Sequence, residues 1–199
     1  MKRLNEQNSN TPEDFDRLFE QRIKRLDAKS RPDQERWNKF MKKFEGGRFL
    51  DVACGLSPVT QQIKRKFPDA EVWALDFASK MIETLRQKYP EVNYIVGDCR
   101  DTPFKDAYFD YIIAGAILEH MDRPEVFLKE MFRILKKNGV FVLSTPCEEG
   151  ITIEIKDMYH LWGFTEEDIE SLLEEHGQVT IEKFSEKIYL TIMAYCKKY

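Results

Sequence analysis

The segment FLDVACGLSP contains the residues whose types and spacing most clearly predict a chemical site. We expect an apolar strand to end at Asp51 and a helix to begin at Pro58. Small residues stand between them, at Ala53, Gly55 and Ser57. Small side chains let the backbone approach a ligand closely, and the start of a helix supplies free N–H groups. By itself the segment predicts a nucleotide-binding loop and leaves the nucleotide open.

Two further acids stand where the next strands are expected to end. Asp76 closes the segment EVWALD, about 20 residues beyond the loop, where a carboxylate can accept both hydrogen bonds of a ribose diol. Asp98 follows YIVG at the expected end of the third strand. Because the carboxyl ends of parallel strands meet above one crevice, we expect Asp51, Asp76 and Asp98 to face a common site. The competing interpretation is that they are helix caps or turn residues.

The elements that must position these acids alternate along the middle of the chain. Short apolar runs are found at Phe49 to Ala53, Val72 to Leu75, Tyr94 to Val96, Tyr111 to Ala114 and Val140 to Leu143. Helical patterns are found at Val59 to Phe67, Lys80 to Tyr89 and Glu125 to Lys137. This alternation predicts βαβ units around a parallel sheet, and the unbroken apolar runs predict that both faces of the sheet are covered.

The N-terminal part of the chain has a helical pattern. Apolar residues recur at helical spacing from Phe15 to Leu26, which predicts an amphipathic helix capped at Thr11 with Pro12 in its first turn. A second helix is expected from about Asp33 to Phe44, before Gly46 and Gly47 end it. We expect the apolar faces of both helices to pack against the sheet.

The C-terminal part predicts a helix followed by a hairpin. The helix is expected from about Glu166 to His176, with Thr165 as its N-cap. Two apolar runs follow, Val179 to Phe184 and Tyr189 to Tyr195, and the link between them is very short. Such a link permits only an antiparallel pair, because a parallel pair needs a long crossover.

Length and composition limit the classes of protein that the chain can belong to. A chain of 199 residues is in the range of a single domain. The formal charge of -4 gives no overall attraction to nucleic acid or anionic lipid, so neither is expected as a partner. The apolar runs are too short to cross a bilayer, and the 4 cysteines lie too far apart to suggest a zinc site or a disulfide framework. We therefore expect a cytoplasmic protein, either a monomer or a homodimer.

Together, these segments resemble a known family. LDVACGLSP, ALDFASKMI, VGDCRDTPF, FDYIIAGAILEHM and FRILKKNGVFVLSTP look like the successive motifs of class I S-adenosylmethionine-dependent methyltransferases, in the family's order. The resemblance implies an α/β fold, a doubly wound, seven-stranded and mostly parallel sheet with a C-terminal antiparallel hairpin. It also implies methyl transfer from S-adenosylmethionine to an O, N or C nucleophile of a small molecule, with S-adenosylhomocysteine as the product. The family's loop is D-x-G-x-G-x-G, and Ala53 and Ser57 replace its outer glycines here.

The resemblance also implies roles for individual residues. Asp51 and the Gly55 loop would bind the methionine end of the cofactor, Asp76 the ribose hydroxyls, and Asp98 with Cys99 would lie beside the adenine. The full set of residues expected at the cofactor is Asp51, Ala53, Cys54, Gly55, Asp76, Phe77, Asp98, Cys99 and Ala114.

The acceptor side of the site is less clearly marked in the sequence. Glu119 and His120 are the catalytic candidates, because they follow the fourth strand, and either could act as a general base. In the resembled family such a pair also serves simply to shape the pocket. Tyr159, His160 and Trp162 are expected to contact the substrate, because aromatic side chains at a pocket mouth exclude water.

Two other functions compete with this interpretation. Glu119, His120 and His160 could supply oxygen and nitrogen ligands to a metal, and E-x-x-E-H with a downstream histidine marks the small-RNA 3′-terminal 2′-O-methyltransferases. Here Ala116 replaces the first acid of that motif, so we expect no metal. The altered loop glycines also allow a methyltransferase-like binding module without turnover. A NAD-binding enzyme is disfavoured, because the loop lacks G-x-G-x-x-G.

The expected organisation is one methyltransferase domain over residues 1–199. Its N-terminal helical cap covers residues 1–45, and its cofactor-binding core covers residues 46–146. Residues 147–164 are a possible substrate lid, and residues 165–199 form the helix and the terminal hairpin.

Overall fold

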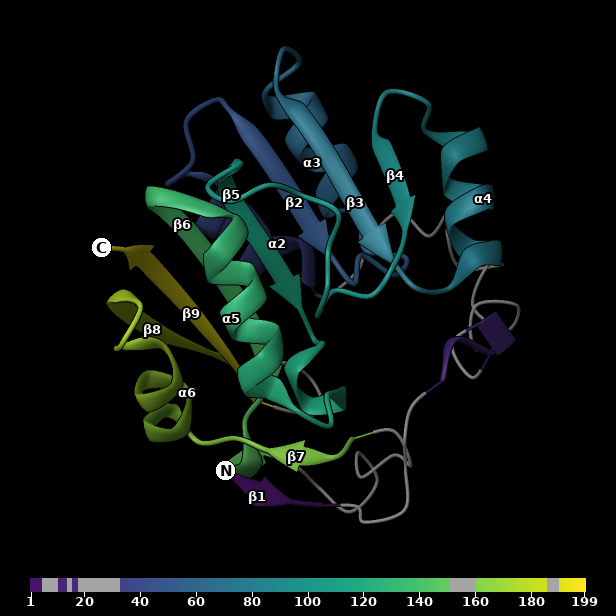
Figure 1. Cartoon of the computed structure of the whole chain (residues 1–199). Helices are drawn as coiled ribbons and strands as arrows, with labels where there is room; N and C mark the ends of the chain where they lie inside the picture. Colours follow the sequence, from purple (N-terminus) through teal and green to yellow (C-terminus); the bar gives the residue numbers. More distant parts are fainter. Residues whose placement is uncertain (5–10, 14–15, 18–32, 151–159, 186–189) are drawn as a thin grey trace.

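A computed structural model describes residues 1–4, 11–13, 16–17, 33–150, 160–185 and 190–199 (Figure 1). Its main sheet has seven strands in the order β4-β3-β2-β5-β6-β9-β8. The strands are β2 (Arg48–Val52), β3 (Glu71–Asp76), β4 (Asn93–Val96), β5 (Phe109–Gly115), β6 (Leu135–Pro146), β8 (Gly177–Ser185) and β9 (Leu190–Lys198). From β4 to β6 neighbouring strands run parallel, whereas β9 is antiparallel to both β6 and β8. The predicted fold class and the terminal hairpin are confirmed.

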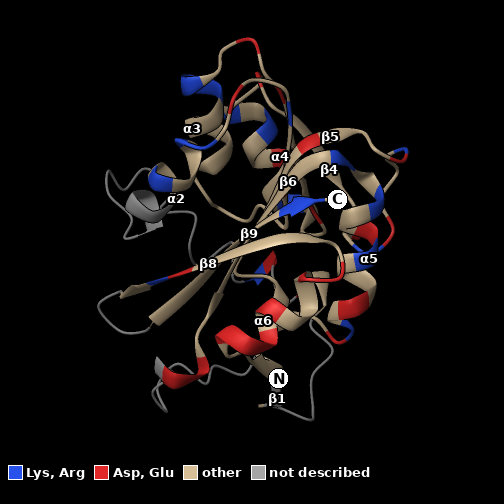
Figure 2. Cartoon of the chain, turned by 90° about the vertical axis from the view of Figure 1, so that its left-hand side faces the viewer, with Lys and Arg blue, Asp and Glu red and all other residues tan. Residues whose placement is uncertain are grey.

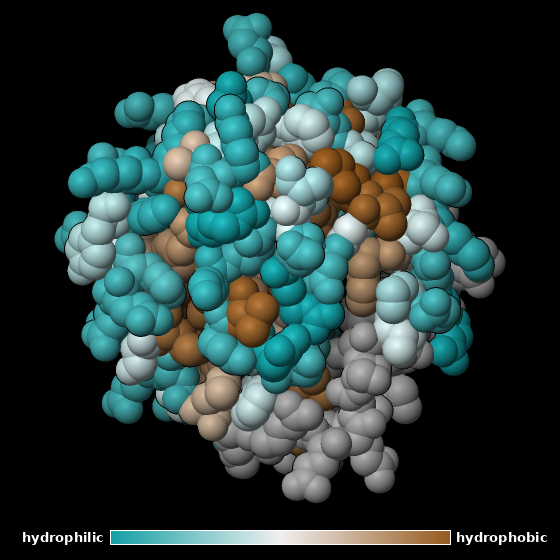
Figure 3. Space-filling model, viewed as in Figure 1, coloured by the Kyte–Doolittle hydropathy of each residue, from teal (hydrophilic) through white to brown (hydrophobic). Residues whose placement is uncertain are grey.

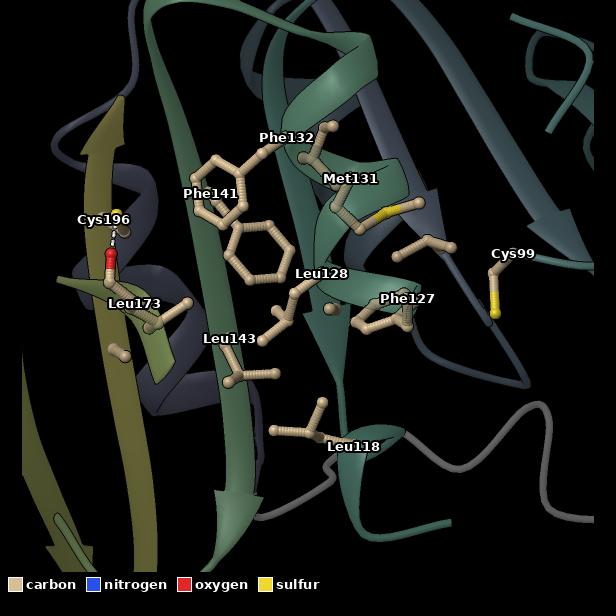
Figure 4. Packing of buried hydrophobic residues seen from close by; sticks show 14 of the residues in the cluster. Cys99, Leu118, Phe127, Leu128, Met131, Phe132, Phe141, Leu143, Leu173 and Cys196 are labelled. Atoms are coloured by element: carbon tan, nitrogen blue, oxygen red, sulfur yellow. Dashed lines mark hydrogen bonds between the residues drawn. The ribbon is translucent and has the colours of Figure 1, made fainter. Parts of the chain in front are cut away.

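Helices cover both faces of this sheet (Figure 1). They are α2 (Asp33–Met41), α3 (Val59–Lys66), α4 (Ser79–Lys88), α5 (Pro124–Ile134) and α6 (Glu166–Leu173), with 3-10 turns η2 (Leu118–His120) and η3 (Glu148–Gly150). One core cluster joins α5 and α6 to one face, as Figure 4 shows around Phe141. The other joins α2, α3 and α4 to the opposite face. Successive strand residues such as Ile112 and Ile113 enter different clusters, which explains the unbroken apolar runs.

The sheet has a switch point between β2 and β5. From β2, the chain moves to β3 and β4 on one side and then returns to β5 and β6 on the other. Connections that leave adjacent strands in opposite directions open a crevice at the carboxyl ends of those strands, and ligands bind there in open α/β sheets. The Asp51 loop follows β2, so the sequence places its clearest chemical signal at this point.

Several element ends differ from the sequence-based prediction. The helix expected to run to Lys137 ends at Ile134, because Leu135 already pairs with Phe109 in the sheet. The helix expected to run to His176 ends at Leu173, and Gly177 begins β8 opposite Lys198. The second N-terminal helix, expected to run to Phe44, ends at Met41. In each case the apolar periodicity of the sequence predicted a longer helix than the structure contains.

A small second sheet joins the N-terminus to the C-terminal end of the expected lid, residues 147–164. Strand β1 (Lys2–Arg3) pairs antiparallel with β7 (Trp162–Gly163), and nothing in the sequence predicted this pair. The expected first helix lies mostly outside the described residues, including its apolar residues from Phe15 to Leu26; Pro12, Glu13, Asp16 and Arg17 are helical.

Helix α6 begins as the sequence predicts. Thr165 is its N-cap, and a capping box forms with Asp168: the Thr165 hydroxyl accepts from the Asp168 N–H at 3.2 Å, and Asp168 accepts from the Thr165 N–H at 3.0 Å. The acidic first turn lies at the positive end of the helix dipole, as the red segment of α6 in Figure 2 shows.

The surface has a mixed character. Its face in Figure 3 is largely hydrophilic, and apolar side chains lie in small groups among the polar ones. Among the described residues, no helix is both long and apolar enough to span a membrane.

Candidate active site

The loop after β2 is tied to the end of β3. The Gly55 N–H donates to Oδ2 of Asp76 at 3.1 Å, and the Cys54 N–H donates to the Leu75 carbonyl at 3.1 Å. Gly55 has a φ of 49° and Ala53 a φ of 52°, both in the left-handed region. A residue with a Cβ in that region costs about 1–2 kcal/mol relative to the right-handed conformation. Ala53 stands where the resembled family has glycine, so the loop keeps the glycine conformation without the glycine.

Two carboxylates are buried below this loop. Asp51 is 2 % exposed and Asp76 is 6 % exposed. Burial raises the pKa of Asp51 well above its usual range, and the charge of Asp76 raises it further. Among the described residues, Oδ2 of Asp51 has no hydrogen-bond partner, and no Lys or Arg forms an ion pair with either acid. A cationic ligand group would therefore stabilise the pair.

Asp76 both supports the loop and lines the crevice. Its Oδ2 accepts from Gly55, and its Oδ1 accepts from the Ala78 N–H at 3.0 Å. Burial raises the pKa of Asp76, and these backbone donors oppose that shift. The backbone of Phe77 is a third donor to this carboxylate. An ionised carboxylate has about four acceptor positions, so about one remains for a hydroxyl group of a ligand.

Asp98 is engaged by an arginine two residues further on. The Arg100 guanidinium donates to Oδ2 of Asp98 at 2.7 Å, and its backbone N–H donates to Oδ1 at 2.8 Å. The side-chain hydrogen bond from Arg100 holds the pKa of Asp98 below its usual value. Arg100 also donates to Oδ1 of Asp122 at 2.8 Å, which links the loops after β4 and β5. The sequence did not predict this Asp98–Arg100–Asp122 network.

One cavity joins these groups. Its lining residues come from the ends of β2, β3, β4 and β5 and from the segment before β7: Ala53, Leu75, Asp76, Phe77, Gly97, Asp98, Cys99, Arg100, Ile117, His120, Met121, Asp122 and Leu161. Five residues of the expected cofactor set thus line it, namely Ala53, Asp76, Phe77, Asp98 and Cys99. Burial raises the pKa of Cys99 to about 12, so at neutral pH its side chain is a neutral thiol.

The other members of the expected cofactor set do not line the cavity. Asp51 and Cys54 are buried, and the backbone N–H of Gly55 donates to Asp76, which does line the cavity. Ala114 is fully buried in the core cluster on the α5 face of the sheet and does not line the cavity. The sequence analysis did not predict the apolar lining residues Ile117, Met121 and Leu161. Leu161 is distant in the sequence from the strand ends, and only the fold brings it to the site.

The catalytic candidates lie on η2, directly after β5. His120 lines the cavity, whereas Glu119 is 2 % exposed and lies behind it. Oε2 of Glu119 accepts a hydrogen bond from Oγ1 of Thr145 at 3.0 Å. The site therefore presents the imidazole of His120 to a ligand and keeps the carboxylate of Glu119 beneath it.

Of the three aromatic residues expected to contact the substrate, the structure describes His160 and Trp162. Tyr159 lies outside the described residues. His160 is 8 % exposed, and its ring centroid lies 4.8 Å from that of His120. The Trp162 indole N–H donates to the Met121 carbonyl at 2.6 Å, which ties the start of β7 to a residue that lines the cavity. Glu119, His120 and His160 each offer one possible ligand atom, and these atoms lie within 4.8 Å of one another.

Comparison with known proteins agrees with this geometry. Residues 50–143 match the family model described as "Methyltransferase domain". This match covers the glycine loop, the three strand-end acids and the Glu119–His120 pair. Residues 50–143 are therefore similar to a methyltransferase domain, and they make up 94 of the 199 residues of the chain.

Curated relatives match the same part of the chain. A demethylmenaquinone methyltransferase from Thermotoga maritima is 36% identical over 116 residues, which cover 56% of this chain and 50% of the relative. One from Staphylococcus aureus is 33% identical over 122 residues, 59% of this chain and 50% of the relative. The methyltransferase domain thus has relatives by sequence, and the chain aligns with only about half the length of each.

Solved structures show the same fold over most of the chain. Magnesium protoporphyrin IX methyltransferase from Synechocystis PCC 6803, with bound S-adenosylhomocysteine, is 15% identical with a TM-score of 0.78 and covers 94% of this chain and 98% of its own. A protein from Pyrococcus horikoshii OT3 is 22% identical with a TM-score of 0.71 and covers 92% of this chain and 99% of its own. The methyltransferase fold therefore extends beyond residues 50–143 to both sides.

Proposed function

We propose that the chain transfers a methyl group from S-adenosylmethionine to a nucleophile of a small molecule. The observation that carries this proposal is a single cavity lined by Asp76 and Asp98 on one side and by His120, Met121 and Leu161 on the other. A cofactor bound along the strand ends would point its reactive end toward η2. Donor and acceptor can then meet in one enclosed space.

The buried acids support this orientation of the cofactor. S-Adenosylmethionine carries an ammonium group and a sulfonium group, and Asp51 and Asp76 are buried beside the loop without a cationic partner among the described residues. We propose that Asp51, Cys54 and the Gly55 backbone hold the methionine end. Ala53 packs against the same end, since it lines the cavity.

The nucleoside would occupy the opposite end of the cavity. The remaining acceptor position of the Asp76 carboxylate suits the ribose hydroxyl groups, and Phe77 and Cys99 offer apolar surface for the base. Because Arg100 already donates to both oxygens of Asp98, we propose that Asp98 positions the adenine jointly with Arg100. Ala114 would act indirectly, as the small residue that packs beneath the site.

Methyl transfer needs little covalent assistance from the protein. The acceptor's lone pair attacks the methyl carbon in line with the carbon–sulfur bond, and much of the acceleration comes from positioning both partners away from water. His120 can take a proton from a hydroxyl or amine acceptor, because its imidazole lies in the cavity wall. Glu119, buried behind it, would act by positioning η2.

The acceptor is proposed to have an apolar part. Ile117, Met121 and Leu161 form an apolar side of the cavity near His120. The matched proteins are named for acceptors as different as demethylmenaquinone and phosphoethanolamine, so the fold alone does not select one. We propose that residues 147–164, with His160 and Trp162, form a lid on this side, and that residues 1–45 complete the cap.

Two measurements on the purified chain test the proposal. Isothermal titration should show binding of S-adenosylmethionine and of S-adenosylhomocysteine at about one molecule per chain. A panel of small hydroxyl, amine and carbon acceptors should then yield S-adenosylhomocysteine for at least one member. Absence of binding would contradict the proposal, whereas binding without turnover across the panel would favour a module that holds the nucleotide.

A further inference from the structure

We infer that Glu119, His120 and His160 form a binding site for one divalent ion of the first transition series, at the acceptor end of the cavity. The role of the ion in methyl transfer rests on the proposed function, whereas binding of the ion does not. Although the sequence favoured no metal, the fold brings together two histidines separated by 40 positions, together with a buried carboxylate.

The three possible ligand atoms are already close to a coordination geometry. They lie within 4.8 Å of one another. Ligand atoms about 2.0–2.1 Å from a tetrahedral ion are separated by roughly 3.3 Å. Movements of the order of 1 Å, within the reach of imidazole and carboxylate torsions, would therefore close the site around an ion.

The backbone holds the two contributing segments together. Glu119 and His120 are neighbours on η2, and His160 belongs to the segment before β7. The Leu161 N–H donates to the Glu119 carbonyl at 2.7 Å, next to both ligating residues. The Trp162 indole N–H fixes the same segment to Met121 at 2.6 Å. These bonds set the separation of the ligands before any ion binds, which is the preorganisation that a metal site needs.

The donor set selects the class of ion. Two imidazoles and one carboxylate suit Zn²⁺, Fe²⁺, Co²⁺ and Mn²⁺, whereas Mg²⁺ and Ca²⁺ prefer oxygen ligands throughout. The Glu119 carboxylate also accepts a hydrogen bond from Thr145 at 3.0 Å, the kind of outer contact that orients metal ligands. Three protein ligands leave coordination positions open for a further molecule.

The open positions would face the methyl pocket, because His120 lines the cavity. An ion at this position would favour an acceptor with an oxygen nucleophile. A hydroxyl group bound to a divalent ion loses its proton to solvent more readily than a free hydroxyl group does. The oxygen lone pair forms the bond to the methyl carbon, the carbon–sulfur bond breaks, and the sulfonium becomes the neutral thioether of S-adenosylhomocysteine. In this arrangement His120 binds the ion, and the proton of the acceptor leaves to water.

Cobalt binding to the untagged full chain tests the site directly. After removal of metals with a chelator, Co²⁺ should bind at one ion per chain, with visible absorption that Zn²⁺ abolishes by displacement. His160→Gln should weaken Co²⁺ binding more than about 100-fold, and Thr145→Val by about tenfold, given the usual cost of losing an outer contact. His176→Gln is the matched control, because this histidine stacks on Phe132 at 4.1 Å and lies next to Glu175. It should bind Co²⁺ as the unaltered chain does.

Binding of S-adenosylhomocysteine, measured on the same samples, separates the two proposals. The inference is overturned if the unaltered chain binds no Co²⁺ while binding S-adenosylhomocysteine, or if His160→Gln and His176→Gln bind Co²⁺ equally. If Co²⁺ binds and S-adenosylhomocysteine does not, the proposed function fails and the metal site stands. Should His160→Gln fail to fold, X-ray absorption of the Co²⁺-loaded unaltered chain decides: two imidazole ligands are expected, and none or one would contradict the site.

Discussion

Asp76, the last residue of β3, accepts a hydrogen bond from the backbone N–H of Gly55 at 3.1 Å. The acid expected to bind ribose therefore also fixes the loop expected to bind the methionine end. We therefore expect a change at Asp76 to act on both parts of the proposed cofactor site.

Replacement of Asp76 should weaken cofactor binding. Asp76→Ala removes the proposed ribose acceptor and the hydrogen bond to the loop. Loss of a charged hydrogen-bonding partner costs about 1–3 kcal/mol, or roughly 5- to 150-fold in affinity. Asp76→Asn keeps one acceptor oxygen and should lose less. Isothermal titration with S-adenosylhomocysteine measures both. Asp101→Ala, at an exposed position of the next loop, is the control and should leave the affinity unchanged. Equal affinities for Asp76→Ala and the control would remove Asp76 from the site.

Ala53→Gly should stabilise the protein. Ala53 has a φ of 52°, where a Cβ is unfavourable and glycine is not. After allowance for the greater freedom of glycine in the unfolded chain, the gain should be about 1 kcal/mol, or roughly 2–4 °C in Tm for a chain of this size. Ala107, with a φ of 51° on an exposed loop, gives the matched control Ala107→Gly. The Tm should rise for both variants. A lower Tm for Ala53→Gly would show that the methyl group of Ala53 stabilises the fold by its packing.

Asp51→Asn should separate stability from binding. Because burial raises the pKa of Asp51, the folded chain holds this proton more tightly than the unfolded chain does. Its contribution to the free energy of unfolding is therefore present below the unfolded pKa, near 3.9, and is lost as pH rises through the folded pKa. At pH 7 Asp51→Asn should be more stable than the unaltered ligand-free chain by about 1 kcal/mol, and this difference should disappear toward pH 4.

The same substitution should reduce cofactor affinity, since it removes the negative charge proposed to face the ammonium group. Thermal unfolding from pH 4 to 8, with and without S-adenosylhomocysteine, measures both effects. Asp101→Asn, which changes an exposed acid in the same way, controls for net charge. A ligand-free Asp51→Asn variant that is less stable than the unaltered chain at pH 7 would contradict the description of Asp51 as a buried, unneutralised acid.

Arg100→Gln should affect binding more than stability. The ion pairs of Arg100 with Asp98 and Asp122 are all at least one-third exposed, and such pairs contribute about 0–1 kcal/mol. The free energy of unfolding in urea should therefore change little. Affinity for S-adenosylhomocysteine should fall several-fold, because Asp98 loses the partner proposed to position the adenine with it. A large loss of stability with unchanged affinity would assign Arg100 to the fold alone.

The sequence predicted much of the sheet, because strands buried on both faces leave continuous apolar runs. It also predicted the C-terminal hairpin, since the short link before Leu190 excluded a crossover. It could not place the helix ends at Ile134 and Leu173, because these depend on strand pairing with residues distant in the chain. The pairing of Lys2–Arg3 with Trp162–Gly163 is too short to leave a pattern.

The sequence predicted those site residues whose position at the end of a single strand determines whether they reach the cavity. Asp76 ends β3, Asp98 follows β4, and both line the cavity, whereas Ala114 is buried within β5. Arg100–Asp122 and His120–His160 join loops 22 and 40 residues apart, and no local pattern encodes such pairs. The burial of Glu119 behind His120 likewise depends on how η2 turns after β5.

A crystal structure of the chain with S-adenosylhomocysteine tests the central claim most directly. The account predicts that the ribose hydroxyl groups lie within hydrogen-bonding distance of Asp76, with the adenine beside Cys99 and the sulfur directed toward His120. A ligand bound outside this cavity, or one inside it whose sulfur points away from His120, would contradict the account.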